Sequence, residues 1–393
     1  MRWFRVDNFF QSIRPVYLAA KLFLLHFETL DFDKRTRRRT LLDQIRFVLS
    51  LVLDLFLTLV ALQNITIMMT MSDSILLNMG YYGSFLLSCL VSAAIPSWNS
   101  WQADSLFELY DNIATVDEKL KQIGIFIDHQ KHHLVSTLVT IFAILIPVFM
   151  FTITTYMYFF ETSFAVARLF PDFIMIVPSL RAILISEIHS CYLMLTLLSL
   201  RNRFAVLNET IKQHFQTVDN TEYYDRIIRN FADLHDLLSD TVEIYNSCFS
   251  VQAMILLTAN FGFTLFALFG VVHATASRAD EITLQVAWSN TIFAVIPMSF
   301  LLQMVLYSGL VHCECKQTAV LIHKVISNGE HSRKIFRELR GFSQQLQHHA
   351  PKVSCKVFNF DWTLFYTLAS SLTTYLVILV QFDLINLNIT KHN

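Results

Sequence analysis

Residues 248–273 read CFSVQAMILLTANFGFTLFALFGVVH, a stretch without a single Lys, Arg, Asp or Glu. A helix of about 20 mostly apolar residues crosses the roughly 30 Å hydrocarbon layer of a bilayer. A helix also satisfies its own backbone hydrogen bonds, which lipid cannot do. The stretch therefore predicts a transmembrane helix.

Comparable apolar runs occur along the whole chain. Six more are long enough to cross a bilayer, at residues 44–66, 75–97, 134–158, 169–199, 284–311 and 363–387. Composition agrees, because 54% of the 393 residues are hydrophobic and only 16% are charged, whereas about a quarter are charged in soluble domains. The predicted fold class is an all-α polytopic membrane protein with seven transmembrane helices.

The distribution of basic residues predicts the orientation of these helices. The segment before the first run and the loops after the second, fourth and sixth runs contain 25 of the 30 Lys and Arg residues. The other side has Arg168, Arg278 and Lys391, while Arg46 and Arg181 fall within runs. Lys and Arg are retained on the cytoplasmic side during insertion. The amino terminus is therefore predicted to be cytoplasmic and the carboxyl terminus extracellular.

The chain divides accordingly into five parts. They are a cytoplasmic segment (1–43), six helices with long cytoplasmic helical loops (44–311), a cytoplasmic anchor region (312–362), a last transmembrane helix (363–388) and an extracellular tail (389–393). Apolar residues repeat every three or four positions within 106–123, 227–245 and 336–346, which predicts amphipathic cytoplasmic helices. Their apolar faces pack either between subunits or within one subunit.

One motif in the last run carries a family resemblance. Residues 374–382 read TYLVILVQF, which resembles the signature of insect gustatory receptors: Thr-Tyr, five hydrophobic residues, then Gln-Phe. Phe360-Asp361-Trp362, Gln345-Leu346 and Pro351-Lys352-Val353 are similar to the same carboxyl-terminal region of that family. The specific match covers residues 340–382, and elsewhere the topology and the loop lengths agree.

The resemblance implies a ligand-gated cation channel, assembled as a homotetramer or heterotetramer around one central pore lined by the last helix. In that family the Gln and Phe of the motif border the gate, which assigns Gln381 and Phe382 to it. Val377 and Val380 would add a hydrophobic constriction that closes by dewetting. The alternatives are a helix-to-helix hydrogen bond for Gln381 and ordinary packing for the valines.

Asp383 follows the motif and is expected at the outer mouth of the pore. A ring of four carboxylates there would concentrate cations. The alternative is a solvated carboxylate at a helix end.

The resemblance also implies a ligand pocket among spans two to six that opens outward. Aromatic residues combined with a few polar ones suit a small-molecule site, although Tyr and Trp also collect at membrane interfaces. The candidates are Tyr81, Tyr82, Tyr156, Tyr158, Phe173, His273, Gln285, Trp288 and Asn290. Because they are apolar and aromatic rather than rich in carboxylates, the expected ligand is an aversive or bitter tastant or another contact chemical cue.

Two charged residues fall within predicted spans. Asp54 in the first run and Arg181 in the fourth are costly in lipid and are expected to pair across helices or to line a wet pocket.

The sequence contains little else that indicates a chemical function. His312-Cys313-Glu314-Cys315 lacks the spacing of a metal site. No catalytic or phosphate-binding motif occurs, and the net charge of −1 gives no support to nucleic-acid binding. We predict neither an enzyme nor a cofactor or metal.

Two other membrane-protein classes are alternatives. A seven-helix G-protein-coupled receptor requires an extracellular amino terminus, opposite to the orientation predicted here. A secondary transporter is expected to show repeated halves with broken helices, and the sequence has no convincing internal repeat. The predicted partners are a small-molecule tastant, membrane lipid and further receptor subunits, in the plasma membrane of sensory neurons.

Overall fold

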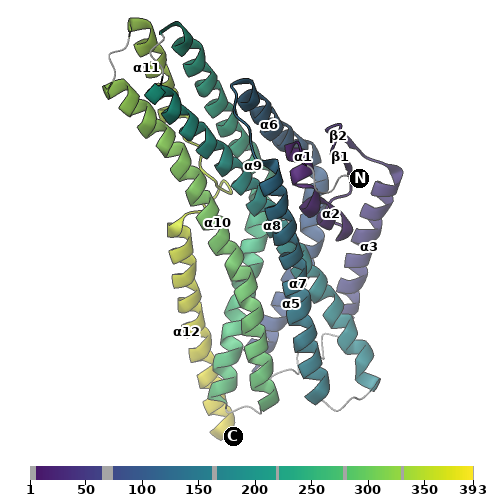
Figure 1. Cartoon of the computed structure of the whole chain (residues 1–393). Helices are drawn as coiled ribbons and strands as arrows, with labels where there is room; N and C mark the ends of the chain where they lie inside the picture. Colours follow the sequence, from purple (N-terminus) through teal and green to yellow (C-terminus); the bar gives the residue numbers. More distant parts are fainter. Residues whose placement is uncertain are drawn as a thin grey trace.

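The computed structural model describes residues 6–63, 74–161, 166–217, 221–277, 281–328 and 332–392. Some stretches of side chains inside helices, including those of Tyr158, Phe173 and Gln285, lie outside this description. The chain forms an elongated bundle of helices, with the amino-terminal segment packed against one half and the carboxyl terminus at the opposite end (Figure 1).

In the described part of the chain, seven long helices run along the bundle. They are α3 (Leu41–Gln63), α5 (Ile75–Trp101), α7 (His129–Glu161), α8 (Val166–Thr217), α9 (Thr221–Ala276), α10 (Glu281–Asn328) and α12 (Trp362–His392). Six contain a whole predicted apolar run, and α3 contains the first run as far as residue 63, since residues 64–66 lie outside the described residues. Among the described residues, six of these helices (all but α3) contain segments long and apolar enough to cross a membrane. The prediction of a helical membrane protein is confirmed.

Helix α3 is the first span, and Asp43, Arg46 and Asp54 lie along it. Its Asp54 is buried and accepts two hydrogen bonds from Arg181 of α8, from Nε at 2.8 Å and from Nη2 at 3.1 Å. Arg181 Nη2 also donates to Ser50 at 2.9 Å. A bidentate pair of this kind satisfies both charges within the membrane. Pairing across helices, one of the two expectations for these residues, is what the structure contains.

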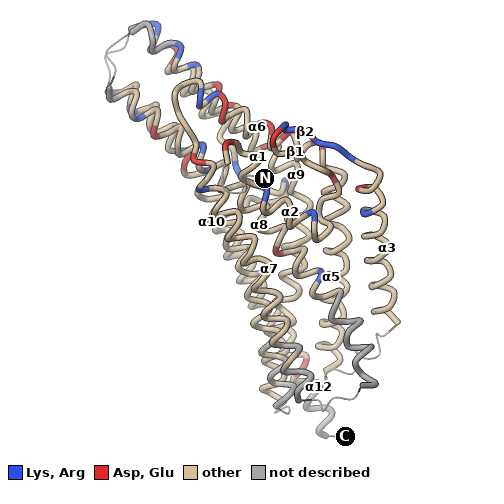
Figure 2. Tube along the Cα trace, turned by 45° about the vertical axis from the view of Figure 1, so that its right-hand side comes forward, with Lys and Arg blue, Asp and Glu red and all other residues tan. Residues whose placement is uncertain are grey.

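Charged residues gather in the half of the bundle where the amino terminus lies (Figure 2). The opposite half, toward the carboxyl terminus, is almost free of coloured charged residues in that view. Because Lys and Arg stay in the cytoplasm, the charged half is cytoplasmic and the carboxyl terminus is extracellular.

Three spans continue into the cytoplasmic half without a break. Helices α8, α9 and α10 contain 52, 56 and 48 residues, which at 1.5 Å per residue is about 70 to 85 Å each. Helices α6 (Ala103–Gln122) and α11 (Arg333–His348) pack beside them. The predicted boundary between residues 311 and 312 therefore falls inside α10, and the one after residue 388 falls inside α12.

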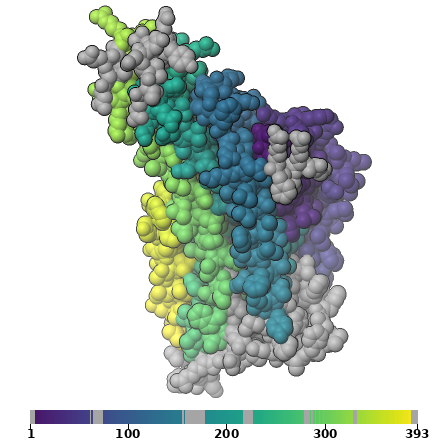
Figure 3. Space-filling view, viewed as in Figure 1, coloured from purple at the N-terminus to yellow at the C-terminus, as the bar shows by residue number. Residues whose placement is uncertain are grey.

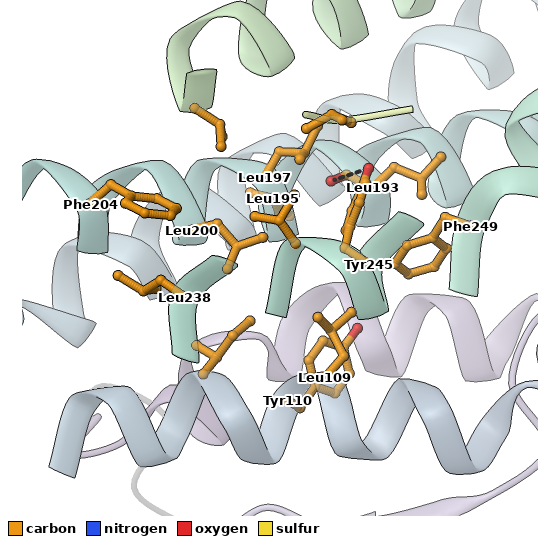
Figure 4. Close-up of a cluster of buried hydrophobic side chains, with 14 of the residues drawn as sticks. Leu109, Tyr110, Leu193, Leu195, Leu197, Leu200, Phe204, Leu238, Tyr245 and Phe249 are labelled. Carbon is orange, nitrogen blue, oxygen red and sulfur yellow. Dashed lines mark hydrogen bonds between the residues drawn. The ribbon is translucent and has the colours of Figure 1, made fainter. Parts of the chain in front are cut away.

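A large apolar core joins these cytoplasmic helices within one subunit (Figure 4). It includes Leu109 of α6, Leu200 and Phe204 of α8, and Leu238 and Tyr245 of α9, each with 2% or less of its surface exposed. Burying a side chain of this size contributes roughly 1.5 to 3 kcal/mol. The amphipathic stripes therefore pack within the subunit, one of the two arrangements expected from the sequence, except for Phe336 at the start of the third stripe, which is exposed.

The amino-terminal segment packs on the cytoplasmic half through two short helices and a hairpin. They are α1 (Phe9–Ser12), α2 (Arg14–Leu22), and β1 (Thr29–Asp31) paired antiparallel with β2 (Thr36–Arg38). Buried Arg203 of α8 donates to both carboxylate oxygens of Asp117 at 2.8 and 2.7 Å, and its guanidinium lies 4.9 Å from the Phe9 ring centroid. Through these contacts, Arg203 links Phe9 of the amino-terminal segment to α8 and α6.

Candidate functional site

Helix α12 is the span least covered by its own subunit. Only 6% of the residues in its apolar window are buried, against 72% for α8. Figure 3 shows α12, in yellow, along one edge of the molecule. Its inner face contacts α9 and α10 through Leu364, Leu368 and Leu372, which pack near Leu257 and Leu301. The remaining faces of α12 are free to contact lipid or another subunit.

One uncovered face of α12 is a stripe of small polar side chains. Residues spaced three, four or seven positions apart lie on the same side of a helix. This spacing relates Thr363, Thr367, Ser370, Thr374 and Gln381, all of which are exposed. The hydroxyls of Thr367 and Thr374 donate to the carbonyls four residues earlier, at 2.8 and 3.0 Å, which leaves their oxygen lone pairs on the surface.

The predicted gate residues occupy different parts of this helix. Val377 lies on the polar stripe and is exposed, as is Gln381 four residues later. Phe382 is also exposed, whereas Val380 is partly buried. At about 100° per residue, Phe382 and Val380 lie on either side of the stripe. Val377 and Gln381 are thus the two predicted gate residues that share one face.

Asp383 lies on the opposite face of α12 from Gln381, because two residues turn a helix by about 200°. Its carboxylate is buried, and one oxygen lies 2.5 Å from Nδ1 of His273 in α9. The other oxygen accepts a hydrogen bond of 2.6 Å from the hydroxyl of Ser74. In this arrangement Asp383 is directed into its own subunit, on the side away from the polar stripe.

The predicted ligand-binding residues are only partly brought together. The Tyr81 hydroxyl is hydrogen-bonded to the side chain of Asn290 in α10. Tyr82 packs against Phe85 and Cys89. Tyr156 and Trp288 are exposed on the outer surface of the bundle, with 60% and 53% of their surfaces accessible. The side chains of Tyr158, Phe173 and Gln285 lie outside the described residues, and His273 contacts Asp383 as described above.

Helices α5 and α9 approach closely beside these residues. A side chain at Gly80 would lie 2.0 Å from the Phe266 ring, and one at Gly270 would lie 2.4 Å from the Tyr81 hydroxyl. A Cβ atom cannot occupy either position without displacing its neighbour. The two glycines therefore allow α5 and α9 to pack directly against each other at the predicted pocket.

A small cavity lies between α9, α10 and α12. Leu257, Asn260, Met298 and Leu368 are among its lining residues, and its volume is about 10 Å³, room for at most one water molecule. A small-molecule ligand needs a few hundred Å³. Helices next to α12 must therefore separate before this cavity can accept one.

Sequence reasoning missed Ser74 and the pairing of His273 with Asp383. Ser74 directly precedes α5 and its hydroxyl accepts from the backbone N–H of Leu77 at 3.3 Å, an N-cap that the residue type could have suggested. The contact between residues 110 positions apart has no local sequence signal.

The cytoplasmic cysteines do not assemble a metal site. Among the described residues, no group of three or more His, Cys, Asp or Glu side chains is placed to hold a metal ion. Cys315 lies 3.4 Å from Nε2 of His235, while Cys313 is exposed.

Comparison with known proteins assigns the family. Residues 13–386 match the family model of the 7tm chemosensory receptors. The chain belongs to this chemosensory receptor family. The resemblance drawn from residues 374–382 is confirmed, and the family is one of receptors rather than of enzymes.

Two curated members of the chemosensory receptor family are similar to the chain. Putative gustatory receptor 28a of Drosophila melanogaster is 23% identical over 97% of this chain and 93% of its own length. Putative gustatory receptor 28b of the same species is 25% identical over 40% of this chain, so the match spans about a third of that relative, 34%.

Two solved structures share the fold. The insect olfactory receptor OR5 from Machilis hrabei superposes with a TM-score of 0.66 at 12% sequence identity, covering 94% of this chain and 97% of that one. The same receptor in complex with eugenol gives a TM-score of 0.61 at 13% identity, with the same coverage. Helix arrangement is thus common to chemosensory receptors of very different sequence.

Proposed function

We propose that this chain is a gustatory receptor subunit that forms a tastant-gated, non-selective cation channel with three further subunits, identical or related. One observation carries the proposal: α12 presents a polar stripe, Thr363 to Gln381, that the rest of the subunit leaves uncovered.

An uncovered polar stripe on a membrane helix costs free energy. Polar side chains facing lipid are unfavourable and normally face a bundle interior or a water-filled cavity. Four copies of α12 around one axis would turn the stripes toward a shared aqueous path. Neutral hydroxyl and amide oxygens can replace part of the hydration shell of a cation without a fixed charge, which favours conduction with little discrimination between monovalent cations.

The proposed gate is at the extracellular part of this stripe. Val377 offers an apolar ring and Gln381 a polar one, a turn apart. Phe382 and Val380 flank them and are in position to pack between neighbouring copies of α12. An apolar ring at Val377 would stop ion flow by dewetting until α12 moves outward.

The proposed ligand is a small, largely apolar tastant, with an aversive or bitter compound as the first choice. Tyr81, Tyr82, Trp288 and Asn290 offer aromatic surface with few charges. The olfactory receptor OR5, which has a similar fold, was solved in complex with eugenol, a small aromatic molecule. The proposed location is the plasma membrane of sensory neurons, where such a current would depolarise the cell.

The experiment records single channels from the purified protein in planar bilayers while a panel of bitter compounds is applied. We expect unitary cation currents. A thiol-reactive cation should then block Thr374→Cys, on the stripe, and leave Leu372→Cys, on the face packed against α9, unaffected. Saturable solute flux without unitary events, or equal modification of both cysteines, would contradict the proposal.

A G-protein-coupled receptor is a weaker alternative. Its amino terminus is extracellular, whereas the charged half of this bundle contains the amino-terminal segment (Figure 2).

A further inference from the structure

A buried polar cluster joins the extracellular ends of three helices. Ser74 is the N-cap of α5, His273 lies near the end of α9, and Asp383 lies near the end of α12. All three are buried, with 6%, 3% and 5% of their surfaces exposed. The cluster therefore connects two walls of the proposed pocket, α5 and α9, to the helix that carries the proposed gate.

Each contact in the cluster uses a different atom of Asp383. Oδ2 lies 2.5 Å from Nδ1 of His273. An ionised carboxylate only accepts hydrogen bonds, and with Asp383 in that form Nδ1 is the donor. The Ser74 hydroxyl donates to Oδ1 over 2.6 Å, and the same hydroxyl oxygen accepts from the N–H of Leu77. A buried carboxylate that loses either donor is left with an unsatisfied oxygen, which is unfavourable in a water-poor site.

The cluster supplies much of the buried contact that positions the outer end of α12. Beyond Leu372 the helix has little buried surface, and Gln381, Phe382, Leu384 and Ile385 around Asp383 are all exposed. The apolar contacts with α9 and α10 are concentrated further in, at Leu364, Leu368 and Leu372. Beyond them, the Tyr375 ring contacts the edge or face of the Phe261 ring of α9, with 6.3 Å between the ring centroids. Among the described residues of α12 beyond Leu372, Asp383 is the one that is buried, so a movement of α9 or α5 would act on the outer end of α12 mainly through it.

A ligand between α5 and α9 would have to separate them. Gly80 packs against the Phe266 ring and Gly270 against the Tyr81 hydroxyl with no space for even one added carbon. His273 is one turn of α9 beyond Gly270, and Ser74 is two turns of α5 before Tyr81. Spreading these helices would pull the two donors of Asp383 apart.

We propose that His273, Asp383 and Ser74 form a latch that holds α12 in its resting position and is released when a ligand separates α5 from α9. This rests on the proposed channel function. His273 and Asp383 are thus positioning residues for opening, since neither lies on the polar stripe itself. Gln381 and Asp383 lie two positions apart on the same helix, so displacement of one moves the other.

The first test is the ligand-independent current of the full-length protein at equal surface expression. Asp383→Asn and His273→Gln each weaken the latch and should raise this current about 5- to 150-fold, the range of ordinary coupling between sites. Ser74→Ala should give a smaller increase. Asp361→Asn is the matched control, since it removes the same charge from the other end of α12, where Asn also caps a helix; it should leave the current at the wild-type level.

The second test closes the latch with a metal ion. Asp383→His places a second imidazole beside His273, and two imidazoles bind Zn²⁺ well. Zinc should raise the melting temperature of the purified variant and lower its ligand-independent current, with reversal by a chelator. Asp383→His combined with His273→Phe is the control and should respond to zinc in neither measurement.

The outcomes separate the two proposals. Tastant-evoked currents in the wild type, together with unchanged ligand-independent currents in Asp383→Asn and His273→Gln, overturn the latch alone. Zinc stabilisation of Asp383→His without current from any variant overturns the channel function, and the gating role of the cluster with it. A zinc response that persists without His273 overturns the contact between α9 and α12.

Discussion

The cytoplasmic half of the bundle and the last span, α12, are stabilised in opposite ways. The first contains a continuous core in which Leu200, Phe204 and Leu238 are fully covered by neighbouring helices. The second has 6% of its apolar window buried and one polar cluster at its outer end. A rigid base next to a loosely attached helix is the arrangement expected of a receptor whose last helix moves, because low local burial allows low-cost local motion.

The largest expected effect is in the cytoplasmic half, at the buried pair between Arg203 and Asp117. Asp117→Asn leaves the guanidinium of Arg203 without its counter-charge, and we expect a loss of about 3 to 5 kcal/mol of stability. The measurement is the thermal unfolding of the detergent-solubilised protein. Asp111→Asn, an exposed position on the same helix, is the control, and an equal loss there would contradict this explanation.

A pair of leucine substitutions compares the two regions directly. Leu200→Ala, in the core of α8, should cost about 2 to 5 kcal/mol. Leu384→Ala, on the uncovered surface of α12 with 44% of its side chain exposed, should cost the isolated subunit less than about 0.5 kcal/mol. The measurement is the thermal unfolding of both variants in the same detergent. Similar losses of stability would mean that the two regions are equally well packed.

Glycines in α5 test how tightly the extracellular half is packed. Gly80→Ala would place a carbon 2.0 Å from Phe266, and overpacking of this kind costs about 1 to 3 kcal/mol. Gly83→Ala adds the same carbon where no atom lies within 4 Å, so it should be neutral or slightly stabilising. The measurement compares the melting temperatures of the two variants. Equal values would mean that α5 and α9 are not in close contact.

The pH dependence of stability should show the contribution of His26 in the cytoplasmic half. Burial against Tyr17 and Tyr192 lowers the pKa of His26 from 6.5 to about 4. The unfolded chain therefore binds the proton first, so stability present above pH 6.5 is lost as the pH falls toward 4. Between pH 7 and pH 5 this amounts to about 2 kcal/mol.

The check on His26 compares the wild type with His26→Phe over this pH range. Phe keeps an aromatic ring between the two tyrosines and does not titrate. The variant should lose about 2 kcal/mol less than the wild type on acidification. Parallel pH profiles for the two proteins would show that His26 is not buried in its neutral form.

Much of the architecture was predictable because it follows from local patterns. Uncharged runs such as 248–273 predict spans, and the placement of Lys and Arg predicts their direction. Two features depend on distant parts of the chain. The continuation of α9 over 56 residues places a span and an amphipathic stripe on one helix, and each pattern alone gives no sign of the junction.

The candidate site was less predictable for a similar reason. His273 and Asp383 were both identified from the sequence, but for separate roles, one in the pocket and one at the pore mouth. Their contact depends on how α9 and α12 cross in space. Helical geometry could have separated Asp383 from Gln381, since residues two positions apart face away from each other.

The ion pair between α3 and α8 has a consequence for biosynthesis. Asp54 is made 127 residues before Arg181, a delay of roughly 6 to 25 seconds at ordinary translation rates. During this interval the first span carries an acidic side chain with no counter-ion from the fourth. Asp54 must therefore stay hydrated, or α3 must be held by the insertion machinery, until the fourth span is synthesised and can dock beside it.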